Sequence, residues 1–424
     1  MRDQSQSHGY LSACLALTLI FTMFRVVSAD DFAQWRGPNR DGISQERGLL
    51  QSWPEKGPQL LWKVSDAGQG YSTPAVVGGR LYTLGSSDSK DEFVQARNAH
   101  SGELIWSRRI GKVGKPKQKP NYAGARSTPT VDGEFLYALG SDGDLVCLTK
   151  ADGQVKWSKN LLADFGGKSG TWAYSESPLV DGDAIVCTPG GTKATLLSLN
   201  KATGDVLWKC PQQEGDEAAY SSIIVVSAAG KRQYVQLLQK GLVGVEAKTG
   251  RFLWRYGRPI SRFNANIPTP VAGDGYVYTA SAGTGGGAVK LVQQADGVAA
   301  KHVYFEGKLP TAIGGTINLG ELLYGTAGQA MMCLEVATGK VLWSERAIGA
   351  ASLTYADGRL YLHGENGSVA LMEPSSQGYR EHGRFTPSGG PQKKGGQKSW
   401  AYPVVADGRL FIRDWDTIWC YQVK

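Results

Sequence analysis

The chain has 424 residues, which is enough for two or three ordinary domains or for one large all-β domain. Its 56 glycines and its 10% of aromatic residues favour many short strands joined by tight turns. The formal net charge is +8, but the basic residues are dispersed and form no long stripe, which argues against nucleic-acid binding.

The N-terminus has the pattern of an export signal. Arg2 precedes an apolar run at 11–24, and the small residues at 27–29 resemble a signal-peptidase cleavage site. The apolar run is short for a membrane-spanning helix, so an uncleaved anchor is the weaker alternative. We expect residues 1–29 to be removed, leaving no transmembrane span and a lead segment at 30–56. The expected location is the periplasm, the cell envelope or the extracellular space.

After the lead segment the sequence repeats itself roughly every 40–50 residues. Each copy contains a hairpin with an Asp-Gly type of turn and then a second hairpin with a Thr-Gly or Asp-Gly turn, where glycine supplies the positive φ that a tight turn needs. Each copy therefore predicts a four-stranded antiparallel blade of a β-propeller. We assign the tryptophan that ends most copies to packing between blades. These tryptophans are Trp106, Trp157, Trp208, Trp254 and Trp343.

Two degenerate copies of the repeat and the two chain ends bring the number of predicted blades to eight. One copy has Tyr304 in the tryptophan position, and the other spans 375–385. The last copy stops at 417–424 after three strands, whereas 57–64 is a lone tryptophan strand with no hairpin before it. We therefore predict an all-β fold, an eight-bladed β-propeller over 57–424, in which the N- and C-terminal strands pair to close the ring.

The repeated sequence Ala-Thr-Gly-x-x-x-Trp, clearest at 200–208 and 335–343, resembles the tryptophan-docking motif of quinoprotein (PQQ-type) propellers. The resemblance covers about 57–424 and implies the fold but no single function. That superfamily includes PQQ-dependent alcohol dehydrogenases and also BamB-like outer-membrane assembly proteins, which bind no quinone. The segment at 32–44 resembles the N-terminal lead of secreted bacterial PQQ-like repeat proteins.

The resemblance implies dehydrogenase activity only if the residues that hold the quinone are present. The dehydrogenases have adjacent cysteines and a calcium-binding glutamate. No two cysteines are adjacent in this chain, and the comparable loop at 188–197 carries Lys193 and no carboxylate. We therefore favour a BamB-like binding or scaffolding module with no cofactor and no catalytic residue. The alternative is a PQQ-dependent alcohol or sugar dehydrogenase that uses PQQ with calcium.

The cysteines point to neither a disulfide framework nor a metal site. Five remain after the signal, an odd number that cannot pair fully within one chain. Three occupy the same apolar strand position in their repeats, so we expect buried thiols. The histidines are too scattered to complete a ligand set. The five cysteines are Cys147, Cys187, Cys210, Cys333 and Cys420.

A binding site is expected where the segments that lead into the innermost strands converge at one mouth of the ring. These segments are rich in aromatic, hydroxyl and amide side chains and carry one cation, which suits a flat polar ligand or an extended peptide. The alternative is that these residues pack against one another and fill the mouth. The predicted mouth residues are Tyr71, Arg126, Trp172, Tyr174, Glu176, Tyr220, Asn264, Asn266 and Trp400.

Two Gly/Pro-rich connections, at 111–125 and 386–398, are basic and flank the first and last blades, which become neighbours when the ring closes. We predict that they form a basic rim that attracts an acidic partner, a glycan or a membrane surface, with plain solvated loops as the alternative. We expect a monomer with a protein or other envelope partner. The rim lysines are Lys112, Lys115, Lys117, Lys119, Lys393, Lys394 and Lys398.

Overall fold

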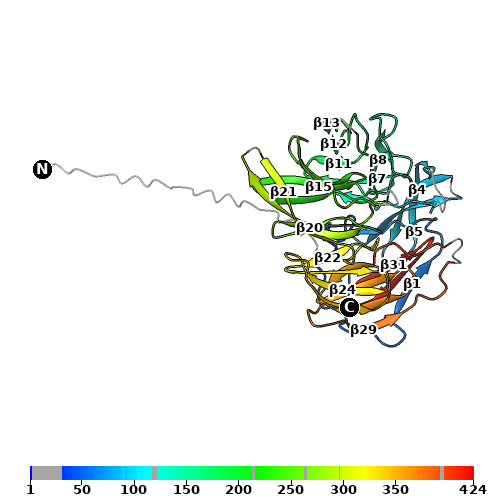
Figure 1. Ribbon diagram of the computed structural model, residues 1–424. Helices are drawn as coiled ribbons and strands as arrows, with labels where there is room; N and C mark the ends of the chain where they lie inside the picture. Colours follow the sequence, from blue (N-terminus) through cyan, green and yellow to red (C-terminus); the bar gives the residue numbers. More distant parts are fainter. Residues whose placement is uncertain are drawn as a thin grey trace.

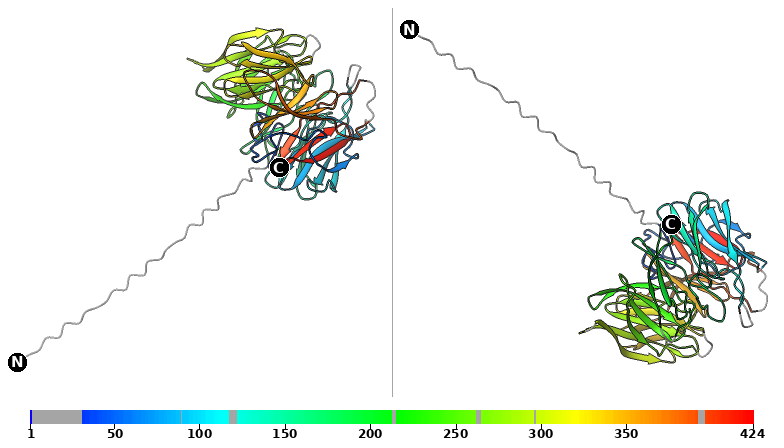
Figure 2. Two further views of the ribbon diagram at one scale, coloured as in Figure 1. Left: turned by 90° about the horizontal axis from the view of Figure 1, so that it is seen from below. Right: turned by 90° about the horizontal axis from the view of Figure 1, so that it is seen from above.

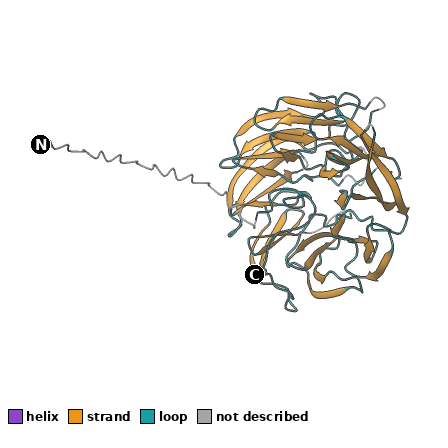
Figure 3. Cartoon of the chain, turned by 90° about the vertical axis from the view of Figure 1, so that its left-hand side faces the viewer, coloured by secondary structure: helices purple, strands orange, loops and turns teal. Residues whose placement is uncertain are grey.

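The computed structural model describes Met1 and seven further ranges, within which the strands β1 to β32 form eight four-stranded antiparallel sheets arranged around one axis (Figures 1 and 3). The predicted export signal lies outside the described residues, apart from Met1. Across the described ranges, no helix has the length and apolarity needed to cross a bilayer. The seven ranges are 31–88, 90–116, 122–212, 215–261, 265–295, 297–391 and 396–424.

Each sheet is one blade, and the first strand given for blades 1 to 4 is the innermost one. Blade 1 is β2 (Ala75–Val77), β3 (Arg80–Ser87), β4 (Asp91–Asn98) and β5 (Leu104–Lys112). Blade 2 is β6 (Thr130–Asp132), β7 (Phe135–Leu139), β8 (Asp144–Thr149) and β9 (Val155–Asn160). Blade 3 is β10 (Leu179–Asp181), β11 (Ala184–Cys187), β12 (Leu196–Asn200) and β13 (Val206–Cys210). Blade 4 is β14 (Ile224–Ala228), β15 (Lys231–Leu238), β16 (Gly241–Glu246) and β17 (Phe252–Tyr256).

The remaining blades follow the same order, except that the last takes its outermost strand from the N-terminal region. Blade 5 is β18 (Val271–Gly273), β19 (Tyr276–Ser281), β20 (Gly285–Gln294) and β21 (Gly297–Glu306). Blade 6 is β22 (Thr316–Leu319), β23 (Leu322–Ala327), β24 (Ala330–Glu335) and β25 (Val341–Arg346). Blade 7 is β26 (Ala351–Ala356), β27 (Arg359–Gly364), β28 (Val369–Glu373) and β29 (Arg380–Phe385). Blade 8 is β30 (Val404–Ala406), β31 (Arg409–Asp414), β32 (Thr417–Gln422) and β1 (Leu60–Val64).

Blade 8 closes the ring. β32 pairs antiparallel with β1, so that Leu60 lies opposite Tyr421 and Val64 lies opposite Ile418. The red C-terminal strands therefore lie beside blue N-terminal ones in Figure 2. The strand missing from the C-terminal repeat is supplied by the N-terminal region, and the predicted eight-bladed propeller with paired ends is confirmed.

The tryptophan at the start of an outer strand packs on the turn of the next blade. The Trp106 ring lies so close to Gly153 that an added Cβ would be 2.7 Å from it, and its Nε1 donates to the Lys150 carbonyl at 3.3 Å. Gly153 has φ +70°, which disfavours any residue with a Cβ. Tyr304 repeats this contact on Gly339, where an added Cβ would be 2.6 Å from the ring. A tyrosine thus serves the same packing role in the degenerate copy.

Blade 4 departs from this pattern because the hairpin of blade 5 is longer than the others. β20 and β21 have 10 residues each, and β21 contacts β17. Trp254 on β17 is buried and donates from Nε1 to Gln233 Oε1 of its own blade at 2.6 Å. The weak repeat in this region of the sequence therefore reflects a hairpin that extends over the neighbouring blade.

The apolar core is divided into layers between neighbouring blades. One layer, for example, joins Leu145 and Cys147 of blade 2 to Ile185 and Leu197 of blade 3. All five described cysteines are buried and none forms a disulfide, as expected from their strand positions. Burial raises the pKa of each of these thiols above its ordinary value, so they act as small apolar side chains.

Ring closure is tested by replacing residues 59–64 with a Gly-Ser segment of equal length, which keeps the tether to the lead segment. We expect aggregation or a large fall in Tm, because β32 would lose its partner and present an apolar edge to other chains. Thermal unfolding followed by circular dichroism, together with light scattering, measures both effects. A variant that melts like the parent protein would show that the ring closes by other contacts.

Tryptophan docking is tested by Trp343→Ala. Trp343 is buried and donates from Nε1 to the Ser375 carbonyl at 2.8 Å, so its removal should cost about 3–5 kcal/mol of unfolding free energy. Trp208 holds the equivalent position in blade 3 but is partly exposed, and Trp208→Ala should cost less. Urea denaturation gives both values. Equal losses at the two positions would contradict the idea that burial of the docked ring sets the cost.

Candidate functional site

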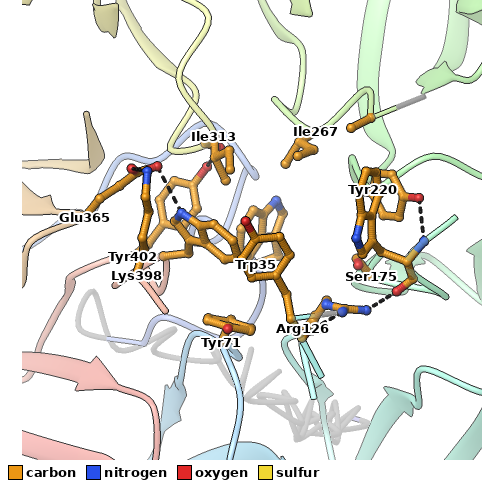
Figure 4. Close-up of a pocket in the computed structure, with 14 residues that line it drawn as sticks. Trp35, Tyr71, Arg126, Ser175, Tyr220, Ile267, Ile313, Glu365, Lys398 and Tyr402 are labelled. Atoms are coloured by element: carbon orange, nitrogen blue, oxygen red, sulfur yellow. Dashed lines mark hydrogen bonds and ion pairs between the residues drawn. The ribbon is translucent and has the colours of Figure 1, made fainter. Parts of the chain in front are cut away.

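A cavity of about 340 Å³ lies on the axis of the ring, and all eight blades contribute to its lining (Figure 4). Most of its residues precede an innermost strand, so the segments predicted to form a mouth do converge there. Seven of the lining residues are aromatic: Trp35, Tyr71, Tyr122, Trp172, Tyr220, Trp400 and Tyr402. The others are Arg126, Ser175, Ala265, Ile267, Ile313, Glu365 and Lys398.

Five of the nine predicted mouth residues line this cavity: Tyr71, Arg126, Trp172, Tyr220 and Trp400. Their side chains come from blades 1, 2, 3, 4 and 8, far apart in the sequence. Their role in binding a ligand stays a prediction.

Three other predicted mouth residues are buried in the protein and do not line the cavity. Tyr174 donates its hydroxyl to the Pro189 carbonyl at 2.6 Å in the layer between blades 2 and 3. The positive φ of Ala173, +71°, turns the chain so that Trp172 and Tyr174 point to different surroundings. Asn266 is buried as well and donates to the Leu238 carbonyl at 2.7 Å.

Glu176, the third of these residues, is a buried acceptor between blades 3 and 4. Its carboxylate accepts hydrogen bonds from the Thr188 backbone N–H at 2.7 Å and from Gln236 Nε2 at 3.3 Å. Burial raises its pKa to about 8, although the hydrogen bonds from Thr188 and the charge of Arg40 act in the opposite direction. The fourth predicted residue absent from the lining, Asn264, lies outside the described residues.

Eight lining residues were not singled out by the sequence pattern, and four of them carry an aromatic ring or a charge: Trp35, Tyr122, Glu365 and Tyr402. Tyr402 lies two residues after Trp400, so in an extended segment both side chains point to the same side, and this spacing could have predicted Tyr402 as a lining residue. Trp35 belongs to the lead segment, whose path across the axis leaves no mark in the repeats. Glu365 lies in the turn between β27 and β28, a position without a counterpart among the mouth residues of the other blades.

Arg126 provides a fixed positive charge in the wall. Its Nη2 donates to the Tyr122 carbonyl at 2.6 Å, and its Nη1 donates to the Trp172 carbonyl. Burial lowers the pKa of this guanidinium from its ordinary value of 12.5, while the nearby Glu92 carboxyl raises it. These two carbonyls hold the guanidinium plane in one orientation.

A paired carboxylate lies elsewhere in the wall, on the side where Glu365 and Lys398 appear in Figure 4. Glu365 Oε2 is 2.5 Å from Lys398 Nζ, and Trp400 Nε1 donates to Glu365 Oε1 at 3.0 Å. Because both oxygens have partners, Glu365 is positioned as a hydrogen-bond acceptor and its charge is compensated by Lys398.

The lead segment closes the channel next to the cavity. Trp35 Nε1 donates to Thr269 Oγ1 of blade 5 at 3.3 Å, and its ring meets Tyr402 at 4.5 Å and 74°. Arg36, fully buried, donates from Nη2 to the Thr316 carbonyl of blade 6 at 2.5 Å. Arg40, equally buried, donates to the Ser177 carbonyl of blade 3 at 2.7 Å. The lead segment therefore spans the ring from one side to the other and forms the floor of the cavity.

The predicted basic rim is described only in part. Lys398 lines the cavity in its ion pair with Glu365, whereas Lys112 and Lys115 line a separate hollow beside Asp91. The two connections nevertheless meet at their C-terminal ends, where the rings of Tyr122 and Trp400 are 4.9 Å apart. The other rim lysines, Lys117, Lys119, Lys393 and Lys394, lie outside the described residues.

The lining does not fit a calcium–quinone centre. Glu365 is the one acidic side chain among the described lining residues, and Lys398 pairs with it. Over the described ranges, no group of three His, Cys, Asp or Glu side chains could hold a metal ion. Lys193, in the loop compared above with the calcium-binding loop of the dehydrogenases, packs against Gly166 and does not line this cavity.

Comparison with known proteins finds one matching family and several relatives. A family model described as "Outer membrane protein assembly factor BamB" matches residues 43–168 and 90–317. The BamB protein of Shewanella oneidensis is 23% identical over 284 residues, which cover 64% of this chain and 66% of that protein. The chain spans less than two thirds of the length of each of these BamB relatives. The match covers 31% of the BamB protein of Moranella endobia and 31% of that of Salmonella typhimurium.

Two other similarities extend over more of the ring. The tetrathionate hydrolase of Acidithiobacillus ferrooxidans is 23% identical over 446 residues, which cover 93% of this chain and 82% of that protein. The crystal structure of BamB from Moraxella catarrhalis superposes with a TM-score of 0.57 at 14% identity, covering 86% of this chain and 97% of that one. At this level of identity, the structural likeness shows the shared fold alone.

The buried Glu176 makes stability depend on pH. Its pKa is about 8 in the folded protein against 4.5 for the free group, so the folded state binds more protons between these values. Its contribution to stability is therefore present below about pH 4.5 and is lost as the pH rises through about 8. The fall in unfolding free energy from pH 5 to pH 8 should be smaller in Glu176→Gln than in the parent, by on the order of a few kcal/mol. Urea midpoints at several pH values measure it, and parallel curves for the two proteins would contradict it.

Proposed function

The chain belongs to the family described as outer membrane protein assembly factor BamB, and we propose that it is an exported binding or scaffolding module of the cell envelope without quinone chemistry. The observation that carries the proposal is the family match over residues 43–317, which includes part of the lead segment and the first five blades. The BamB relatives are named for outer membrane assembly, which favours an envelope location and a protein partner.

The chemistry of the axial cavity supports binding rather than catalysis. Within the described lining, the sole carboxylate is tied to Lys398 and to the Trp400 indole, and the sole aliphatic hydroxyl is that of Ser175. A nucleophile needs an adjacent base, and a pair of acid and base groups needs two titratable side chains in reach of one substrate. Aromatic walls with a few oriented polar groups are typical of a binding site.

A second candidate function is an enzyme. The similarity to a tetrathionate hydrolase spans 93% of this chain, and a quinohemoprotein alcohol dehydrogenase from Pseudomonas putida has a similar fold. A quinoprotein oxidoreductase would need PQQ with calcium at the axis. The positive charges of Arg126 and Lys398 and the lack of a second carboxylate in the described lining disfavour a calcium ion there.

The partner surface that we favour is the face on which the cavity lies. The connections at 111–125 and 386–398 both reach it, because Tyr122 and Lys398 line the cavity. Together they contain seven lysines, whose field would speed the approach of an acidic partner and would be screened within about 10 Å at 0.1 M salt.

This surface is tested by replacing five loop lysines with glutamine: Lys115, Lys117, Lys119, Lys393 and Lys394. The matched control replaces five exposed lysines elsewhere, which changes the net charge equally: Lys56, Lys156, Lys248, Lys301 and Lys340. Partners are captured from the envelope of the source cell, and association rates are then measured at two salt concentrations. We expect slower association and a weaker salt dependence for the loop variant alone, with Tm nearly unchanged because exposed charges contribute little to stability. If both variants capture the same partners at the parental rate, the basic loops are not the partner surface.

A further inference from the structure

The surface that a ligand would meet in the axial cavity is mainly aromatic and aliphatic. Tyr71, Tyr220, Ala265 and Tyr402 are buried and form the back of the wall. Figure 4 shows Ile267 and Ile313 on the opposite side of the cavity from Tyr71. The apolar and aromatic lining residues that keep exposed surface are Trp35, Tyr122, Trp172, Ile267, Ile313 and Trp400.

The charges of the described lining favour an uncharged ligand, because each has a group of opposite charge beside it. Glu365 Oε2 is 2.5 Å from Lys398 Nζ. Arg126 donates to two backbone carbonyls. Burial lowers its pKa, and the nearby Glu92 carboxyl raises it. A ligand with a net charge would disturb one of these pairs, and the described lining holds no free counter-charge for it.

The polar groups that a ligand can use are few and lie mainly on one side. Glu365 accepts from Lys398 and from the Trp400 indole, and its oxygens keep lone pairs for a further donor. A saccharide has a hydroxyl on most ring carbons, and each hydroxyl needs a partner when it is buried. Apart from the groups on aromatic rings, the described lining offers only Arg126, Ser175, Glu365 and Lys398. It therefore suits a ligand with one polar group at one end.

The tilt of the rings favours an aromatic ligand that is met at several angles. The Tyr122 and Trp400 rings are inclined by 63°, and so are the Trp172 and Tyr220 rings. Aromatic pairs prefer edge-to-face or offset contacts, so a further ring finds both faces and edges in this wall. The volume of about 340 Å³ is close to the lower end of the range of ligand pockets, roughly 300–1,000 Å³. A folded partner cannot enter it, whereas a single aromatic side chain can.

We propose that the axial cavity binds an uncharged aromatic ring with one hydroxyl or N–H group, a phenol or an indole, which lies against the tryptophans and donates to Glu365. A tyrosine or tryptophan of a partner carries such a ring, and so do free small molecules. The inference rests on the proposed binding function and deepens it by naming the chemistry that the cavity takes. None of the five lysines replaced above is among the described lining residues, so failure to bind the ring and failure to capture a partner are separate results.

Isothermal titration calorimetry of the full chain tests the ring chemistry. The probes are p-cresol, 3-methylindole, toluene, which lacks the polar group, and 4-methylcyclohexanol, which keeps the hydroxyl and lacks the aromatic ring. We expect p-cresol and 3-methylindole to saturate the protein. Binding of p-cresol should be about two- to tenfold tighter than that of 4-methylcyclohexanol, because the aromatic contacts are lost in the latter. Toluene should bind several fold more weakly than p-cresol, because it cannot donate to Glu365.

Three further probes test the charge and the number of polar groups that the cavity accepts. They are 4-hydroxyphenylacetate, glucose, and PQQ with calcium chloride. Each should bind more weakly than p-cresol, because it brings a net charge or several hydroxyl groups into a wall without partners for them.

Two blocked peptides distinguish the sources of the ring. They are acetyl-Gly-Gly-Tyr-Gly-Gly-amide and the same peptide with leucine in place of tyrosine. Tighter binding of the tyrosine peptide than of p-cresol would assign the cavity to a partner side chain, and the reverse order would assign it to a free small molecule. Both results keep the phenol as the ligand, and in both the leucine peptide should bind more weakly than the tyrosine peptide.

Matched variants locate the site. Glu365→Gln keeps an acceptor for the Trp400 indole but removes the charge, and it should lower the ratio of p-cresol affinity to toluene affinity. Glu373→Gln is the control, because Glu373 lies in the same blade and is paired with Arg380 at 3.6 Å but does not line the cavity. Trp400→Leu should lower the preference for p-cresol over 4-methylcyclohexanol, which is a ratio that a general loss of fold would not select.

Three outcomes would overturn the proposal. If p-cresol fails to saturate the protein, or binds no better than 4-methylcyclohexanol, the cavity is not a site for an aromatic ring. Parental affinity ratios in Glu365→Gln or in Trp400→Leu would show that the ring does not bind where we place it. Tighter binding of glucose, or of PQQ with calcium, than of p-cresol would replace the uncharged aromatic ring by a saccharide or by the quinoprotein alternative.

Discussion

The pairing of β1 with β32 is the constraint on which the rest of the structure depends. Without it, eight blades would form an open array with an apolar edge at each end. The seam is reinforced by Arg413 of blade 8, which is fully buried and donates to the carbonyls of Ser72 at 3.0 Å and Gly68 at 2.9 Å in blade 1. Burial lowers the pKa of Arg413 to about 9, which reflects the cost of desolvating the cation, and its several carbonyl partners offset that cost. Closure is thus a network of contacts between two chain regions that are more than 340 residues apart in numbering.

The cavity inherits its shape from this closure. Tyr71 precedes the first strand of blade 1, and Trp400 precedes the first strand of blade 8, yet their rings are 4.8 Å apart across the seam. Trp415 of blade 8 adds a further contact to Tyr71 at 5.5 Å. The wall of the cavity is therefore continuous only in the closed ring. Arg126 keeps its orientation through carbonyls of blades 2 and 3, so the donor side of the cavity also depends on the packing of neighbouring blades.

The sequence predicts the parts of this protein that repeat and misses those that occur once. The fold follows from it because each blade reuses the glycine turn and the docked ring, so that Trp106 on Gly153 and Tyr304 on Gly339 are the same contact. The mouth segments are also predictable, since every innermost strand begins near the axis. The sequence does not predict which side chains of these segments face the axis. At Ala173, for example, a φ of +71° turns the chain, so that Trp172 lines the cavity and Tyr174 does not. Trp35 has no counterpart in any blade, so no repeat reveals it.

The lead segment shows why a polar sequence fills the centre of this propeller. Closing the ring gives blade 8 its outermost strand but leaves an inner edge on every blade, with backbone groups that need partners. The lead segment supplies partners for the innermost strands of blades 1 and 7. Phe32 exchanges backbone hydrogen bonds with Val76 of blade 1, and Ser44 donates its backbone N–H to Tyr355 of blade 7. Carbonyl groups that lie too far from the backbone of the lead segment are bonded by its arginines, because an arginine carries five N–H donors at the end of a long side chain. Arg40 thus bonds the carbonyls of Ser177 and Pro178, at the cost of a pKa lowered to about 10 by burial. An apolar segment in the same place would avoid this desolvation but would leave the same carbonyls unpaired. The arginines therefore hold the lead segment in the centre of the ring, where its Trp35 lines the cavity.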